Sequence, residues 1–136
     1  MKAKFSIISP DAVDYLPKEA LAYLDKAQKG MNSDLTPKDV IAHAKNGMGD
    51  IIIVSITGKI AGVAFFMYGD TRDGRVLNVV SLGADRMMEW KDSFLEFTIN
   101  RAKSMNCNEI VLITRKGWGR VFPVFKAVGV VYSLRV

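Results

Sequence analysis

The sequence predicts an α/β domain with a mixed α+β sheet, in which an antiparallel meander is joined to one parallel β-α-β crossover and helices cover both faces. The first observation is size, because 136 residues suit one domain, and 49% hydrophobic with 24% charged residues is typical of a globular chain. The second is the alternation of strand-like and helix-like apolar patterns, with short turn signals between them. The third is the lack of repeats and linkers, so we expect residues 1–136 to form a single domain.

The chain begins with a strand and a helix. Residues 4–8 alternate in character, as a half-buried strand does. Ser9 offers a hydroxyl cap and Pro10 is favoured at the first helical position, so a helix should start here. Pro17 falls inside this helix and should kink or restart it, because proline lacks the amide N–H that a helix interior needs.

A short second helix and a three-stranded meander follow. Thr36 and Asp39 are spaced as a capping box, which predicts the start of the helix. Thr57 and Gly58 form a two-residue hairpin signal between two apolar runs, the first of which is rich in β-branched residues and suits a strand buried on both faces. The predicted strands of the meander are residues 51–56, 59–68 and 75–82.

The remaining elements form the crossover and the end of the chain. A helix at about residues 86–105 joins the last meander strand to a strand at 109–114, so these two strands should be parallel, with a right-handed connection. A final helix is expected at 117–127, bent or shortened by Pro123, and a closing strand at 130–136.

The long helix should supply much of the core. One cluster is expected to contain Trp90, Phe94, Phe97, Val111 and Ile113. Arg101 shares the apolar face of this helix, and a side chain that snorkels toward water is the expected outcome. Acidic side chains such as Asp50 fall at expected turns, where local hydrogen bonding favours them, so none is assigned as a catalytic base.

Positive charge is concentrated at one end of the sequence. The net charge is +5, and residues 97–136 hold seven basic side chains and one acidic one. Such a segment suits an anionic partner, with a solvated basic face as the alternative. Within it, an indole lies among three cations. One interpretation, placed first for Trp118, is structural, with the indole in the core and the cations solvated. The functional interpretation is contact with a partner or an anion through Arg115, Lys116, Trp118 and Arg120. Contact with single-stranded nucleic acid is a further alternative that is not favoured.

Several classes of protein do not fit this sequence. No apolar run approaches the roughly 20 residues of a membrane-spanning helix, and no signal-peptide apolar region follows the basic first residues, so a cytoplasmic protein is expected. Cys107 is the single cysteine and His43 the single histidine, so an internal disulfide cannot form and no metal site is expected. Cys107 is expected to be a small buried side chain.

Four features carry a resemblance to a known family. They are a strand ending in glycine (residues 77–83), Trp90 on the long helix, a small-residue turn with cysteine (102–110) and an Arg-x-Gly-Trp-x-Arg segment (115–121). With the order of elements, they resemble the GCN5-related N-acetyltransferase (GNAT) fold. The last two-thirds of the chain resemble the small GNAT-like proteins that tailed phages and prophages encode.

The resemblance implies a place for acetyl-CoA. In this fold, backbone N–H groups receive the pyrophosphate where the third meander strand turns into the long helix, and the pantetheine arm lies between that strand and the next. The residues that this places at the cofactor are Ser81, Leu82, Gly83, Ala84 and Arg86. Asp85 and Glu89 add negative charge beside them, and a degenerate loop of this kind predicts weak or absent acetyl-CoA binding.

The sequence is therefore compatible with two functions. The first is a phage- or prophage-type assembly or interaction protein, non-catalytic or weakly active and without a cofactor. It would contact other virion or host proteins, or an anionic ligand, in the host cytoplasm or in a virion, and no membrane. The alternative is an acyl-CoA-dependent N-acetyltransferase that acts on an amine. No catalytic residue is assigned, because the transferases of this fold use a tyrosine near the last helix and that predicted helix has none.

Overall fold

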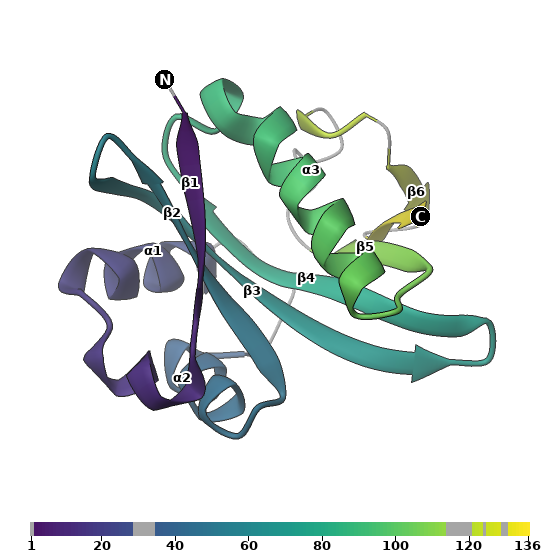
Figure 1. The fold of residues 1–136 in the computed structure, drawn as a ribbon, viewed down its shortest axis with the longest axis horizontal. Coiled ribbons are helices and arrows are strands. Elements are labelled where there is room, and N and C mark those ends of the chain that lie inside the picture. The colour runs from purple at the N-terminus through teal and green to yellow at the C-terminus, as the bar shows by residue number, and fades with distance from the viewer. Residues whose placement is uncertain (1, 29–34, 114–120, 124, 129–130) are drawn as a thin grey trace.

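The strands of the chain form one mixed sheet. The computed structural model describes residues 2–28, 35–113, 121–123, 125–128 and 131–136. Within them lie seven strands in the order β1-β2-β3-β4-β5-β7-β6 (Figure 1). These are β1 (Ala3–Ile8), β2 (Gly49–Ile56), β3 (Lys59–Thr71), β4 (Gly74–Ala84), β5 (Glu109–Ile113), β6 (Lys126–Val128) and β7 (Val131–Arg135). The pair β4–β5 is parallel and the other neighbouring pairs are antiparallel, which confirms the predicted fold class.

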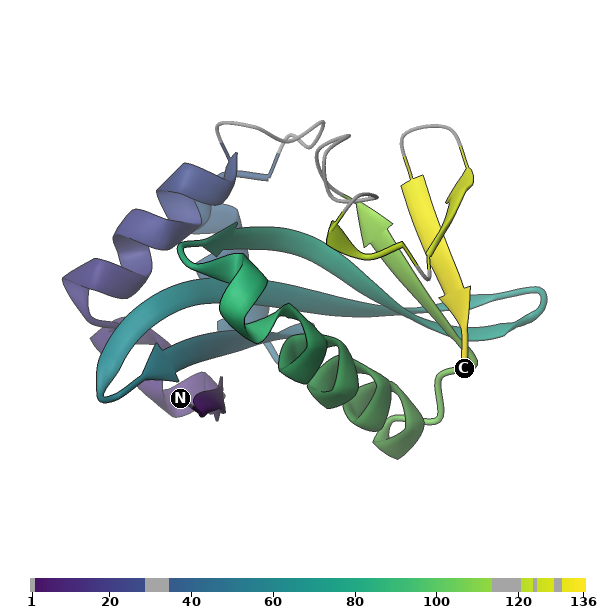
Figure 2. The same ribbon diagram turned by 90° about the horizontal axis from the view of Figure 1, so that it is seen from above.

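Helices cover both faces of the sheet (Figure 2). One face carries a 3-10 helix η1 (Pro10–Tyr15), α1 (Lys18–Gln28) and α2 (Pro37–Lys45), and the other carries α3 (Met87–Ser104). Side chains on neighbouring positions of a strand point to opposite faces, so the β-branched run of β2 is buried on both, as predicted. None of the helices in the described ranges is long and apolar enough to cross a membrane.

The signals for helix starts are confirmed in part. The helix after β1 stops before Pro17 and restarts after it, as α1. In α2 the capping box is present, because the Asp39 N–H donates to Thr36 Oγ1 at 3.2 Å and the Thr36 N–H donates to Asp39 Oδ2 at 2.9 Å. The predicted hydroxyl cap at Ser9 is wrong, since its side chain makes no capping hydrogen bond. The 3-10 helix there begins at Pro10, as predicted, because the fixed φ of proline suits a helical start.

The turn between β2 and β3 is confirmed as a tight hairpin. Thr57 and Gly58 have φ values of 49° and 78°, and two central residues with positive φ match the right-handed twist of the flanking strands. A bulge follows, because Val54 pairs with Gly62 whereas Ser55 pairs with Ile60. A side chain at Gly62 would lie 3.2 Å from the ring of Trp90, so the glycine lets α3 approach the sheet closely.

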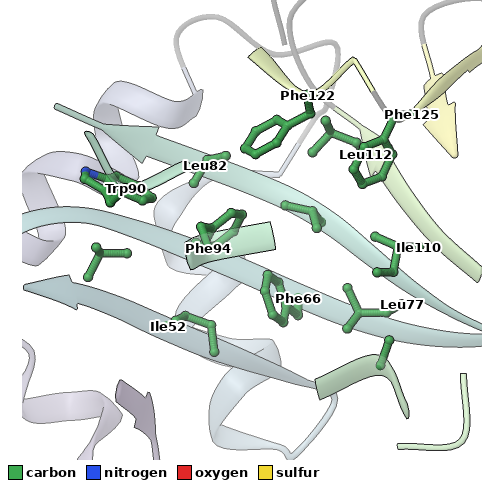
Figure 3. Close-up of a cluster of buried hydrophobic side chains, with 14 of the residues drawn as sticks. Ile52, Phe66, Leu77, Leu82, Trp90, Phe94, Ile110, Leu112, Phe122 and Phe125 are labelled. Carbon is green, nitrogen blue, oxygen red and sulfur yellow. The ribbon is translucent and has the colours of Figure 1, made fainter. Parts of the chain in front are cut away.

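The core beneath α3 differs from the expected one at a single strand. Trp90 and Phe94 are buried and Phe97 packs beside them, as predicted, but the β5 residues in this cluster are Ile110 and Leu112 (Figure 3). The expectation for Val111 and Ile113 is therefore wrong by one position. The parallel pairing sets this alternation, because Ile110 and Leu112 lie opposite Leu77 and Val79, which face α3.

The predicted final helix at 117–127 is wrong in its second half. Lys126–Val128 form β6, which pairs antiparallel with β7, while residues 117–120 lie outside the described residues. Pro123 lacks an amide donor and disfavours helical geometry at the residue before it, which accounts for the break. Phe122 and Phe125 are nonetheless buried, and the Phe122 ring centroid lies 6.2 Å from that of Phe94.

Candidate functional site

The pairing between the two parallel strands ends before β4 does. β4 pairs with β5 only from Val76 to Val79, although β4 continues to Ala84. A bulge in the pairing of β3 with β4 lies at this last pair, because Phe66 pairs with Val79 whereas Phe65 pairs with Ser81. Bulges bend a strand and increase its twist.

The chain passes from β4 into the N-terminus of α3 at this same end of the sheet. Asp85 and Arg86 form the connection, and Arg86 takes a left-handed conformation with φ 58°. The Glu89 N–H donates to the Arg86 carbonyl at 2.9 Å, which closes the first turn of α3. The first amides of a helix have no acceptor within it, and the helix dipole adds partial positive charge there. This end of α3 therefore favours an anion.

Asp85 joins three elements at this point. Its carboxylate accepts hydrogen bonds from the Tyr23 hydroxyl at 2.7 Å and from Lys26 Nζ at 2.8 Å, both on α1. Its N–H donates to the Ala61 carbonyl of β3 at 2.8 Å, and its own carbonyl accepts from the Trp90 indole N–H at 3.0 Å. Hydrogen bonds from Lys26 and Tyr23 lower the pKa of Asp85, and burial together with Asp85 raises the pKa of Tyr23 to about 12.

Arg86 and Glu89 form a second pair beside the first. The guanidinium meets the carboxylate with two hydrogen bonds, Nε to Oε2 and Nη2 to Oε1, the latter at 2.8 Å. The hydrogen bond from Arg86 lowers the pKa of Glu89. The sequence suggested that Asp85 and Glu89 place unbalanced negative charge here. In the structure each acid lies against a cation, so the connection is close to neutral.

The predicted cofactor residues lie around this connection. Ser81, Leu82 and Gly83 are buried in β4, Ala84 is partly exposed and Arg86 is exposed. Gly83 has a structural reason to be glycine, because a Cβ at this position would lie 2.1 Å from the Tyr23 carbonyl oxygen of α1. The residues predicted to contact a partner or an anion, Arg115, Lys116, Trp118 and Arg120, lie outside the described residues.

A half-buried polar cluster lies at the other end of α3. Asp50 Oδ2 accepts hydrogen bonds from the Tyr68 hydroxyl at 2.6 Å and from Arg101 Nη2 at 2.9 Å and Nε at 3.1 Å. Burial and the bond to Asp50 raise the pKa of Tyr68, so its hydroxyl stays protonated at neutral pH. The expected snorkelling of Arg101 is wrong, because its guanidinium is held by Asp50 instead of reaching into solvent.

The sequence held only a weak signal for this cluster. Asp50 and Arg101 are 51 residues apart, and Tyr68 and Arg101 are 33 apart. No periodic pattern links such positions. The one hint was an arginine on the apolar face of a helix, which needs either water or a partner. The sequence pattern around Asp50 predicts a turn, whereas the residue lies in β2.

The single cysteine and the acidic side chains suggest no metal centre or reactive thiol. Cys107 is buried, as expected, and burial raises the pKa of its thiol. Within the described part of the chain, no three histidine, cysteine, aspartate or glutamate side chains gather closely enough to hold a metal ion.

Comparison with solved structures shows which known fold the chain has. No protein-family model and no curated protein matches this sequence. A structure described as a predicted acetyltransferase with acetyl-CoA from Clostridium acetobutylicum matches with a TM-score of 0.67 at 16% identity, over 93% of this chain and 92% of that one. A GNAT-family acetyltransferase from Brucella melitensis in complex with acetyl-CoA matches with a TM-score of 0.66 at 13% identity, over 98% and 88%.

A third similar structure extends over the full length of both chains. The polyamine N-acetyltransferase of Drosophila melanogaster matches with a TM-score of 0.68 at 10% identity, and the alignment covers 99% of this chain and 100% of that one. The chain therefore has the fold of the GNAT acetyltransferases. The comparisons do not bear on an origin in phages or prophages.

The residues present fit an acyl-CoA at the end of β4, beyond its last pair with β5. Phosphate groups would meet the first amides of α3, with the cations Lys26 and Arg86 close by. The pantetheine arm would run along β4 beyond its last pairing at Val79. The side chains of Ser81 and Leu82 are buried, so any contact from them would come from their backbone groups.

Proposed function

We propose that this protein is an acyl-CoA-dependent N-acetyltransferase that acts on an amine. The observation that carries the proposal is that β4 continues past its last pair with β5 at Val79 and leads to the anion-favouring N-terminus of α3. Structures with bound acetyl-CoA are among the most similar ones, which supports the same proposal. The sequence alone also allows this function, as the alternative to an assembly role. That assembly role gains no support from the comparisons and stays a prediction.

The bound acyl-CoA would supply an activated thioester. The amine nitrogen attacks the thioester carbonyl, the carbon–sulfur bond breaks, the thiolate takes up a proton and the amine gives one up. The chain would contribute binding and orientation, through the amides of the first turn of α3 and the backbone of β4 beyond its last pair with β5. We assign no general base.

The test is a calorimetric titration of the protein with acetyl-CoA, followed by hydrogen–deuterium exchange with and without the ligand. We expect saturable binding and slower exchange in peptides that cover residues 80–90. Protection confined to other segments would show that acetyl-CoA binds there and not at residues 80–90. If no heat and no protection appear at any ligand concentration up to millimolar, the proposal is wrong and the assembly role becomes the better hypothesis.

A further inference from the structure

We propose that Glu89 acts as an internal anion that holds Arg86 and must release it before a phosphate group of the acyl-CoA can bind there. This inference rests on the proposed function and adds a determinant of cofactor affinity. Its starting point is geometric, because the guanidinium of Arg86 already makes two parallel hydrogen bonds to the Glu89 carboxylate. Arginine binds phosphate through the same fork of donors, so carboxylate and phosphate compete for one partner.

The position of Glu89 strengthens the competition. Glu89 lies in the first turn of α3, where the helix dipole favours negative charge, and Arg86 is the residue immediately before the helix. The carboxylate thus lies at the helix end that the proposed function assigns to phosphate. The lowered pKa of Glu89 agrees with a charge that is stabilised in place.

The neighbouring acid does not share this role. The carboxylate of Asp85 is held by Tyr23 and Lys26 of α1, at 2.7 and 2.8 Å. Of the two acids in the connection, Glu89 is therefore the one that faces Arg86. The side chains of Arg86 and Glu89 are 45% and 50% exposed, and exposed ion pairs are held weakly, so an incoming phosphate can displace the carboxylate.

The inference predicts a gain of function on removing one charge. Glu89→Gln keeps the size of the side chain but loses its charge, and so weakens the competition with phosphate for Arg86. We expect CoA to bind about three- to fivefold more tightly, the ratio that corresponds to an exposed ion pair. The gain must depend on Arg86, so Glu89→Gln in an Arg86→Gln background should change the affinity by less than about twofold.

The experiment is a calorimetric titration with CoA of the unmodified chain, Glu89→Gln, Arg86→Gln, the double variant and the control Glu96→Gln. Glu96 is an exposed acid two turns further along α3, so its loss should leave the affinity unchanged. Circular dichroism checks that each variant retains its helices.

The possible results of these titrations lead to different conclusions about the inference and the proposed function. A gain for Glu89→Gln that requires Arg86 supports the inference. An equal gain in both backgrounds would show a general effect of charge, and no gain would show no competition; either overturns the inference and leaves the proposed function intact. If neither the unmodified chain nor any variant binds CoA, the proposed function fails, and the inference fails with it.

Discussion

Arg101 of α3 and Asp50 of β2 meet at one carboxylate oxygen, Oδ2, which lies 2.9 Å from Nη2 and 3.1 Å from Nε of the arginine. The hydroxyl of Tyr68 in β3 donates to the same oxygen. The ion pair therefore fastens the C-terminal half of α3 to the two strands beneath it. At the N-terminal end of the helix, Asp85 makes the corresponding connection through the Trp90 indole.

Replacement of Asp50 by asparagine should destabilise the fold. The side chains of Asp50 and Arg101 are 18% and 26% exposed, so the loss leaves a half-buried guanidinium without its counter-charge. We expect the free energy of unfolding in urea to fall by about 1–3 kcal/mol. The matched control is Asp92→Asn, because the side chain of Asp92 is 92% exposed. Equal stability of the two variants would contradict the prediction.

Replacement of Gly83 by alanine separates a structural role from a cofactor role. The added Cβ would lie 2.1 Å from the backbone carbonyl of Tyr23, so α1 must move away from β4. We expect a loss of roughly 1–3 kcal/mol or more in denaturant unfolding. Gly69→Ala is the control in β3, because the nearest atom to its new Cβ would be a side-chain nitrogen at 3.8 Å. A Gly83→Ala variant as stable as this control would argue that the glycine serves only the cofactor.

The hydrogen bonds that the Asp85 carboxylate accepts should make the free energy of unfolding depend on pH, with a sign that follows from the lowered pKa. Its pKa is lowered in the folded chain by hydrogen bonds from Lys26 and Tyr23, so folding favours the ionised carboxylate. The stabilisation is present above the usual pKa of 3.8 and is lost as the pH falls through the lower folded value. We expect Asp85→Asn to be less stable than the unmodified chain at neutral pH, and the difference to shrink on acidification below 3.8.

Unfolding curves of both proteins, recorded across this pH range, measure the effect. The variant Asp92→Asn corrects for the general loss of one negative charge. A difference between Asp85→Asn and the unmodified chain that stays constant with pH would argue against a contribution from the ionised carboxylate.

Local patterns predicted most of the fold. The capping box of Thr36 and Asp39 and the hairpin at Thr57 and Gly58 depend on residues a few positions apart, and both are present. Where local pattern was uninformative, the prediction failed. The run 109–113 is apolar after its first residue, so alternation could not show which side chains face α3. The pairing of β5 with β4 decided it.

The candidate site was less predictable for a related reason. Its position at the end of β4 followed from the order of elements, but its charge balance did not. Lys26 lies 59 residues from Asp85, and Tyr23 lies 62 residues away. Only the packing of α1 on β4 brings these side chains together. The sequence therefore showed Asp85 as an unpaired acid beside a phosphate site, and the folded chain neutralises it.

Replacement of Trp90 by phenylalanine should loosen the connection that precedes α3. The indole N–H donates to the Asp85 carbonyl, while the ring is buried and meets Phe94 edge-on at a centroid distance of 5.8 Å. Phenylalanine keeps much of the ring packing but leaves the carbonyl without this donor, so we expect a loss of about 2–4 kcal/mol. The diagnostic measurement is hydrogen–deuterium exchange of residues 85–89, which should become faster than in Phe94→Leu, a variant with reduced packing and no lost donor. Equal exchange in the two variants would show that ring volume alone, and not the indole hydrogen bond, holds this segment.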